Sequence, residues 1–264
     1  MACLLIDACT VATPVAVVTG ASRGIGKQLC ADLAAAGYDV VCVSRSTQAT
    51  PTRLPGSVEE TAKQVEQCGR RALAIGLDVR DENGVAALAE RVLAELGRCD
   101  LLINNAAIAA PVPALEDTTR RWRLGVDVNL NGPFYMIYYF CPRMRRGEGR
   151  VINISSGAAV TPQFRRPNYT ATKLALEGLT QALGYELKGR VAVNALRLDL
   201  PVWSEGFAAT LPEDTDLFFE DPVIMSDAVL WLAKQPIDYT GQVLSISALR
   251  ERGIVRPVTP YGSR

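Results

Sequence analysis

The sequence predicts a single α/β domain built on a doubly wound parallel sheet of about seven strands, with helices on both faces. Short β-branched runs alternate with longer stretches of helical periodicity, which is typical of right-handed strand–helix–strand units. The runs are apolar on both faces, as expected for strands that helices cover on either side. No internal repeat and no long linker divides the 264 residues, so one domain is the better count.

The elements follow one another in regular alternation. Seven runs are expected as strands: Val15–Thr19, Asp39–Ser44, Ala72–Asp78, Leu101–Asn104, Arg150–Ser155, Val191–Leu196 and Gln242–Ile246. Six stretches are expected as helices: Gly24–Ala36, Glu59–Gln67, Glu82–Leu96, Thr118–Met144, Asn168–Leu187 and Ser226–Lys234. Ser57 and Glu60 form a capping box at the start of the second helix. The domain should span residues 14–250, between a loose leader (1–13) and a tail (251–264), with a substrate loop at about 198–222.

Composition excludes several function classes. Lys+Arg and Asp+Glu balance at 28 each, so no global field favours nucleic acid or an anionic membrane. The chain has no histidine, which excludes Ser-His-Asp and Cys-His nucleophile systems and any metal site that needs imidazole. No metal is therefore expected. The seven cysteines are scattered without a Cys-x-x-Cys spacing, which favours a reducing compartment.

No segment reaches the roughly 18 apolar residues of a membrane span, and the N-terminal region lacks the positive charge of a signal peptide. We expect a cytoplasmic protein.

A glycine-rich turn follows the first strand. The segment Thr19-Gly20-Ala-Ser22-Arg23-Gly24-Ile25-Gly26 leads directly into a helix. Such a turn lets backbone amides and a helix N-terminus approach a pyrophosphate. A Walker A loop would need Gly and Ser/Thr where Ala21 and Gln28 stand, and G-x-G-x-x-G would need Gly at Leu29. The pattern T-G-x-x-x-G-x-G fits a Rossmann-type cofactor site, the alternative being a plain tight turn.

Charge at the end of the second strand indicates which dinucleotide would bind. An NAD site usually has an acidic residue there for the ribose 2′-hydroxyl, but this strand runs into Arg45 and the next acid is Glu59. Arg23 adds a second guanidinium on the same side, and two arginines suit a 2′-phosphate. The sequence therefore favours NADP(H) over NAD(H). The alternative is two solvated surface arginines.

Tyr169 and Lys173 form the chain's only Tyr-x-x-x-Lys. Residues four apart share one face of a helix, so an ammonium can lie beside a phenol and lower its pKa. Tyr169 could then exchange a proton with a substrate oxygen. Ser156 stands thirteen residues earlier at a strand end, and Asn129 lies in the long helix after the fourth strand.

These elements, in this order, resemble the short-chain dehydrogenase/reductase family over about residues 14–247. The stretch Thr50–Gly56 with Asp78–Asp81 is similar to a subgroup that includes hydroxysteroid-dehydrogenase-like proteins. The resemblance implies hydride transfer between a nicotinamide and a carbonyl or secondary alcohol. Tyr169 would be the general acid/base, Lys173 would hold the nicotinamide ribose, Ser156 would orient the carbonyl and Asn129 would anchor a water.

The resemblance also implies contacts along the rest of the cofactor. Asn104, Asn105 and Ala106 would line the adenine-ribose side, and Asp78 and Val79 would contact the adenine. Related enzymes are commonly homodimers or homotetramers, packed through the helices that here carry Asn129 and Tyr169. The expected partner is a small-molecule carbonyl or alcohol.

The sequence departs from the family pattern around the substrate. Leu198-Asp199 replaces the usual Pro-Gly, Ser245–Ala248 replaces a glycine pair after the last strand, and Ala107 stands where a glycine is common. The candidate substrate residues are Gly157, Gln163, Trp203 and Phe207. The aromatic residues could form a lid or could be ordinary core.

Three functions stay open at this point. The leading one is an NADP(H)-dependent reductase or alcohol dehydrogenase. The others are a non-catalytic NADP-binding regulator and an epimerase or dehydratase on the same fold. Retention of Asn129, Ser156, Tyr169 and Lys173 together speaks for an enzyme.

Overall fold

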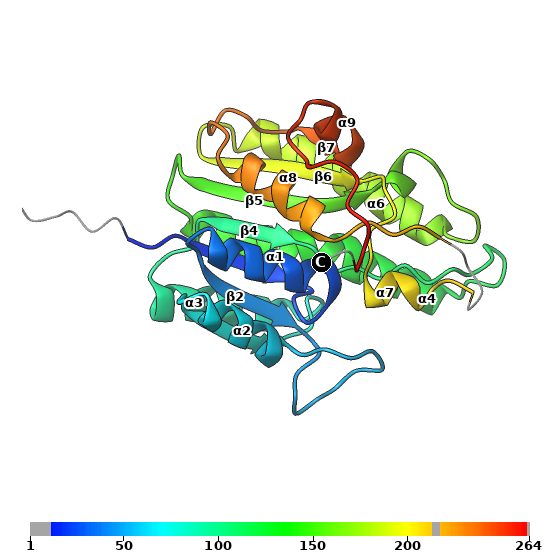
Figure 1. The fold of residues 1–264 in the computed structure, drawn as a ribbon, viewed down its shortest axis with the longest axis horizontal. Helices are drawn as coiled ribbons and strands as arrows, with labels where there is room; N and C mark the ends of the chain where they lie inside the picture. Colours follow the sequence, from blue (N-terminus) through cyan, green and yellow to red (C-terminus); the bar gives the residue numbers. More distant parts are fainter. Residues whose placement is uncertain (1–11, 213–216, 263–264) are drawn as a thin grey trace, which may run out of the picture.

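The computed structural model describes residues 12–212 and 217–262. Seven parallel strands form one sheet in the order β3-β2-β1-β4-β5-β6-β7 (Figure 1), which confirms the predicted fold class. The strands are β1 (Val15–Thr19), β2 (Asp39–Ser44), β3 (Ala72–Gly76), β4 (Leu101–Asn104), β5 (Gly149–Ser156), β6 (Val191–Leu198) and β7 (Val243–Ser245). The direction of winding reverses between β1 and β4, and ligands of such sheets bind at the carboxyl ends there.

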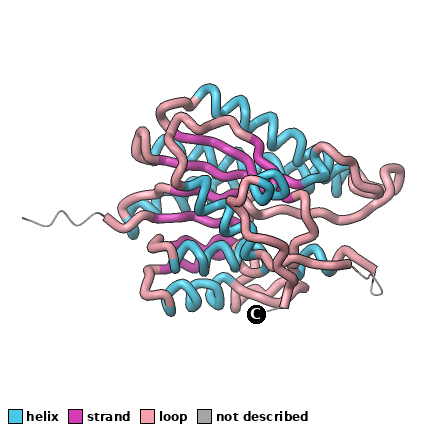
Figure 2. The backbone as a smooth tube through the Cα atoms, turned by 45° about the horizontal axis from the view of Figure 1, so that its top comes forward, coloured by secondary structure: helices cyan, strands magenta, loops and turns pink. Residues whose placement is uncertain are grey.

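Helices cover both faces of the sheet (Figures 1 and 2). They are α1 (Gly24–Ala35), α2 (Val58–Gln67), α3 (Glu82–Leu96), α4 (Thr119–Val126), α5 (Gly132–Phe140), α6 (Pro167–Glu186), α7 (Glu205–Ala208), α8 (Val223–Ala233) and α9 (Ile246–Glu251). Ala16 and Val18 pack with α1, α2 and α8, whereas Val15 and Val17 pack with α3 and α5. Side chains alternate along a strand, so the all-apolar runs fill two separate cores.

The predicted helix over Thr118–Met144 is interrupted in its register. A π-helical turn, Asp127–Asn131, separates α4 from α5, and a 3₁₀ turn at Cys141–Arg143 follows α5. Pro133 stands in the first turn of α5, and it has no N–H to donate to the carbonyl four residues earlier. That carbonyl belongs to Asn129, so the break falls on a predicted site residue.

After β7 the chain forms α9 and then a segment that packs against the rest of the domain. Ser245 belongs to the last strand, as expected, and also caps α9 by accepting a hydrogen bond from the Ala248 N–H at 3.2 Å. Beyond α9, Val255 is buried in the core. Further on, the Asp221 and Tyr261 N–H groups donate to Thr259 and Phe219 carbonyls. Residues 251–262 therefore pack against the end of the predicted substrate loop.

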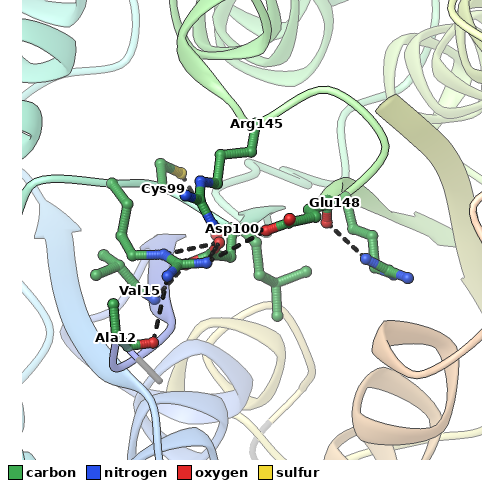
Figure 3. Close-up of polar contacts among 9 residues, drawn as sticks. Ala12, Val15, Cys99, Asp100, Arg145 and Glu148 are labelled. Atoms are coloured by element: carbon green, nitrogen blue, oxygen red, sulfur yellow. Dashed lines mark hydrogen bonds and ion pairs between the residues drawn. The ribbon is translucent and has the colours of Figure 1, made fainter. Parts of the chain in front are cut away.

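A polar cluster joins the first and fourth strands at the edge opposite the carboxyl ends (Figure 3). Asp100 accepts the Val15 N–H at 2.8 Å and two nitrogens of Arg98, while Arg98 also donates to the Ala12 carbonyl at 3.2 Å. The start of β1 is thereby held to the start of β4.

Among the helices of the described residues, none has the length and apolar character that a membrane span needs.

Candidate active site

A cavity of about 930 Å³ opens at the carboxyl ends of the strands, beside the switch between β1 and β4. Most of the predicted site residues line it. These are Gly20, Ser22, Arg23, Gly24, Ile25, Gly26, Arg45, Asp78, Val79, Asn105, Ala106, Ser156, Gly157, Gln163, Tyr169, Lys173 and Phe207. Thr19, Asn129 and Trp203 lie outside its wall. The topology therefore brings residues from across the chain into one site.

The glycine turn can pack as it does only because its glycines lack side chains. Gly20 and Gly24 have φ of +68° and +51°, and a Cβ on Gly26 would lie 2.2 Å from the Gly20 carbonyl oxygen. The turn leads into the N-terminus of α1, where backbone amides and the helix dipole favour an anion. This cradle fits the pyrophosphate of a dinucleotide.

Thr19 and Asn105 support the turn from the fourth strand. The Thr19 hydroxyl accepts the Asn105 and Ala106 N–H groups at 3.0 and 3.1 Å, and the Asn105 side chain donates to the Thr19 carbonyl at 2.9 Å. Thr19 is buried, so it holds the turn to the end of β4 from beneath.

Tyr169, Ser156 and Lys173 meet on one wall of the cavity. Ser156 ends β5, and the two other residues lie on the first two turns of α6. The hydroxyl of Ser156 lies near enough to the Tyr169 phenol to act on its pKa. The Lys173 Nζ lies 5.6 Å from the centre of the Tyr169 ring and donates to the Ile154 carbonyl at 2.6 Å. The arrangement places a phenol, a hydroxyl and an amine at the carboxyl end of β5.

The electrostatics of this wall differ from the sequence expectation. Burial raises the pKa of Tyr169, and the Ser156 hydroxyl and the charge of Arg166 only partly oppose it. Burial also lowers the pKa of Lys173 to about 8, against the pull of Glu177. The predicted lowering of the Tyr169 pKa by Lys173 is therefore wrong for the chain alone, because desolvation of the phenolate dominates and the amine bonds to Ile154.

Behind Lys173 lies an ionic network that sequence reasoning missed. The buried Glu177 carboxylate accepts the Ser155 hydroxyl at 2.7 Å and two Arg197 nitrogens at 2.8 and 2.6 Å. Ser155 and Arg197 are paired across β5 and β6. Glu177 lies four residues after Lys173, on the same helix face, and this spacing was the available signal.

Asn129 is buried in the π turn and its side chain is fully used. It accepts the Ile108 N–H at 2.9 Å and donates to the Ile108 carbonyl at 2.9 Å and to the Thr172 hydroxyl at 3.1 Å. It thereby links the segment after β4 to α6, one residue before Lys173. Its side chain supports the wall formed by Ser156, Tyr169 and Lys173 from behind.

At the other end of the cavity, Arg23 was expected to be available to a 2′-phosphate, but its guanidinium is hydrogen-bonded to the loop after β2. Its guanidinium donates to Ser46, Thr52, Leu54, Pro55 and Gly56, at 2.7–3.4 Å. Arg23 thus organises the loop 46–56. That loop brings a further arginine, Arg53, to the cavity wall, which sequence reasoning also missed. Arg45 is half-exposed and lies 3.7 Å from Asp78.

The substrate side is formed by the loop after β6. Ser204 crosses the glycine turn so closely that a Cβ on Gly24 would lie 2.7 Å from its own Cβ. Phe207 lines the cavity, whereas Trp203 stacks on Tyr261 with ring centres 4.5 Å apart and meets Phe219 edge-on. Phe207 is therefore placed to contact a substrate, and Trp203 anchors the loop to the C-terminal segment.

Comparison with known proteins agrees with this geometry. The short chain dehydrogenase family matches residues 14–199. Hydroxysteroid dehydrogenase-like protein 2 of Xenopus tropicalis is 30% identical over 241 residues, which cover 90% of this chain and 58% of the relative. The chain thus spans less than two thirds of that relative's length. The match agrees with the predicted subgroup.

Two solved structures are similar over most of the fold. A short chain dehydrogenase from Mycobacterium paratuberculosis bound to NAD has a TM-score of 0.78 and 27% identity, covering 89% of this chain and 96% of its own. A blue fluorescent protein from a metagenomic library, in complex with NADPH, has a TM-score of 0.77 and 29% identity, covering 88% and 95%. With the glycine turn and the Ser156–Tyr169–Lys173 wall in one cavity, this chain belongs to the short-chain dehydrogenase family.

Proposed function

We propose that the protein is an NADP(H)-dependent oxidoreductase that interconverts a carbonyl and a secondary alcohol on a small molecule. The observation that carries this proposal is that Ser156, Tyr169 and Lys173 line one cavity, with the Lys173 Nζ 5.6 Å from the centre of the Tyr169 ring, and that the far end of this cavity is the glycine turn. When bound, the nicotinamide supplies or accepts the hydride. The turn Gly20–Gly26 would hold its pyrophosphate.

The residues of the wall then divide the remaining work. Ser156 donates to the substrate oxygen and fixes the carbonyl at the end of β5. The Tyr169 hydroxyl gives that oxygen a proton during reduction and takes it back during oxidation. Lys173 adds a positive charge beside the phenol. Asn129 holds α6 through Thr172, so the phenol and the amine keep their positions.

The preference for NADP(H) rests on the arginines of the adenosine end. Arg45 follows β2 where an NAD site would have an acid, and Arg53 comes to the wall on the loop that Arg23 holds. The Asp78 carboxylate forms an ion pair with Arg80, whose Nη2 lies 2.7 Å from Asp78 Oδ2, and it also lies near Arg45. A 2′-phosphate would therefore meet guanidinium groups.

An apolar surface on the helices behind the site supports a homo-oligomer. Trp122, Phe134, Tyr138 and Leu174 are 42–59% exposed on α4, α5 and α6, and adjoining exposed apolar residues mark interfaces. The partner would be a second copy, in a dimer or tetramer. Light scattering of wild type and Tyr138→Glu checks this, and a monomeric wild type would contradict it.

The decisive experiment tests the wild type and Tyr169→Phe with NADPH, NADH and their oxidised forms against a panel of carbonyls and alcohols. Tyr169→Phe should lose ~10²–10⁴-fold in kcat while NADPH binding, followed by fluorescence, is retained. Binding without turnover of any substrate would point to a regulator. Product formation without net NADPH consumption would point to an epimerase or dehydratase.

A second experiment isolates the cofactor preference. Arg45→Asp should weaken NADPH binding by at least about tenfold and leave NADH binding nearly unchanged. Arg91→Asp makes the same charge change on α3, where Arg91 forms an ion pair with Glu95, and serves as the matched control. Equal losses for both cofactors in Arg45→Asp would defeat the 2′-phosphate assignment.

A further inference from the structure

Arg166 carries a positive charge at the wall of the active-site cavity. The proposed chemistry does not use this charge. Arg166 immediately precedes α6, which begins at Pro167, and it lines the same cavity as Tyr169 three residues later. Residues three apart at a helix start lie on one side, with Cβ atoms about 5–6 Å apart. The positive charge of Arg166 acts on the Tyr169 phenol and lowers its pKa, against the effect of burial.

The guanidinium of Arg166 is held but not neutralised. Its Nη2 donates to the Thr210 hydroxyl at 3.0 Å, and its central carbon lies 5.7 Å from the centre of the Phe207 ring. Both contacts come from the substrate loop. One of the five N–H donors of the guanidinium is used in this way, and the described residues offer the others no partner.

Three other partly buried arginines form ion pairs with carboxylates, whereas Arg23 and Arg150 donate to backbone carbonyls. Arg98, Arg197 and Arg250 have side chains 17–23% exposed, and each forms a two-pronged ion pair with a carboxylate. Arg166 is also half-buried, yet it pairs with no carboxylate among residues 12–212 and 217–262. Within the described residues, its charge therefore lacks the carboxylate partner that Arg98, Arg197 and Arg250 have.

The acids on the cavity wall cannot supply that compensation. Among the described residues, only Asp78 and Asp199 are acids that line the cavity. Asp78 lies at the adenosine end with Arg80. Asp199 accepts hydrogen bonds from the N–H and the hydroxyl of Ser247. A negative group that enters beside Tyr169 would find Arg166 as its open cationic partner.

We propose that Arg166 binds a carboxylate of the substrate, so that the enzyme reduces an oxo acid or oxidises the corresponding hydroxy acid. This inference rests on the proposed function. A guanidinium binds a carboxylate through two parallel N–H···O bonds. The short spacing from Arg166 to Tyr169 favours an acid whose carboxylate is only a few bonds from the reacting carbon. Phe207 and Leu200, which also line the cavity, would contact its apolar part.

The substrate carboxylate only orients the molecule through Arg166, and none of its bonds changes in the reaction. In the reducing direction the carbonyl carbon gains a hydride from NADPH, the carbon–oxygen double bond becomes single, and Tyr169 transfers a proton to the oxygen. NADP⁺ leaves oxidised, and Tyr169 recovers its proton from solvent. Arg166 fixes which end of the molecule faces the phenol.

Matched substrates separate this role from that of a loop anchor. We would measure kcat/KM with NADPH for a series of 2-oxo and 3-oxo acids and their methyl esters, in wild type, Arg166→Met and Arg166→Lys. Arg165→Met is the control, because Arg165 is adjacent, exposed and outside the cavity wall. NADPH binding is measured for every variant.

In wild type at least one acid should exceed its ester. In Arg166→Met that acid should lose roughly 10- to 100-fold, while the ester and NADPH binding change little. Arg166→Lys should recover part of the loss, and Arg165→Met should behave as wild type. Equal losses for acid and ester would overturn the proposal and make Arg166 a loop anchor. Turnover of neutral carbonyls with no preference for acids would overturn this inference alone, whereas no turnover of any carbonyl would overturn the proposed function.

Discussion

Asp199 accepts hydrogen bonds from both the backbone N–H of Ser247, at 3.1 Å, and the Ser247 hydroxyl. The two residues belong to two of the three segments in which the sequence departs from its family, the segment just after β6 and the start of α9. Gly157 passes close by, since a Cβ there would lie 3.2 Å from the Asp199 Cα. The two departures are therefore one contact, in which a carboxylate faces the first turn of a helix.

We expect this contact to contribute to stability and to be cooperative. Asp199→Ala and Ser247→Ala should each lower the free energy of unfolding by about 1 kcal/mol. The double variant should lose clearly less than the sum, because both changes remove the bond between the Ser247 hydroxyl and the Asp199 carboxylate. Urea unfolding of the four proteins measures the coupling. Additive losses would mean that the two side chains act independently.

The glycine turn should be intolerant of a single methyl group. Gly26→Ala places a Cβ against the Gly20 carbonyl oxygen, so we expect a loss of roughly 1–3 kcal/mol in unfolding free energy and weaker NADPH binding. Gly178→Ala is the control, since a Cβ at this exposed position in α6 meets nothing within 4 Å. It should gain about 0.5–1 kcal/mol. Unchanged cofactor binding in Gly26→Ala would contradict the cradle.

Stability should rise with pH because of Lys173. Its pKa in the folded chain, about 8, lies below the ordinary 10.5, so the unfolded chain holds this proton more tightly and stability rises between these values. From pH 7 to 10, wild type should gain about 2–3 kcal/mol relative to Lys173→Met. Above pH 10 the raised pKa of Tyr169 acts in the opposite sense.

The measurement is urea unfolding of the cofactor-free proteins at several pH values. Lys188→Met, at an exposed position after α6, controls for the loss of a lysine. A constant difference between wild type and Lys173→Met across this range would show that the amine is not desolvated.

Glu177 should act on the same amine from behind. Glu177→Gln replaces one of the two carboxylate oxygens that accept from Ser155 and Arg197 with an NH2 donor, and it removes the charge that favours protonated Lys173. We expect a loss of about 2–4 kcal/mol in stability and a further fall of the Lys173 pKa, seen as a shift of the pH profile of kcat to lower pH. Glu186→Gln, exposed at the end of α6, should do neither. A stability loss with an unmoved pH profile would leave Glu177 a purely structural role.

Local patterns identified most of the fold and the reactive pair. Strands that helices cover on both sides need unbroken apolar runs, so β1 and β2 could be placed within the sequence. Tyr169 and Lys173 could be paired because i, i+4 spacing is a property of one helix. The π turn at Asn129 could not be placed, since it depends on how Pro133 shifts the backbone register within a longer helix.

The contacts that the sequence did not predict join distant segments of the chain. Glu177 meets Arg197 only because β6 pairs with β5 in a particular register. Arg166 reaches Thr210 only because the substrate loop folds back over α6. Arg23 was expected to face a phosphate, but the loop 46–56 folds around it. No spacing within a single element indicates such pairings.

The dependence of an eleven-residue loop on one side chain has an evolutionary consequence. Because Arg23 bonds to five positions between 46 and 56, a change of loop length would leave its donors unmatched, and loss of the arginine would leave the loop carbonyls without donors. The residue and the loop should therefore be inherited together. Among relatives, an arginine at this point of the glycine turn should co-vary with a loop of this length.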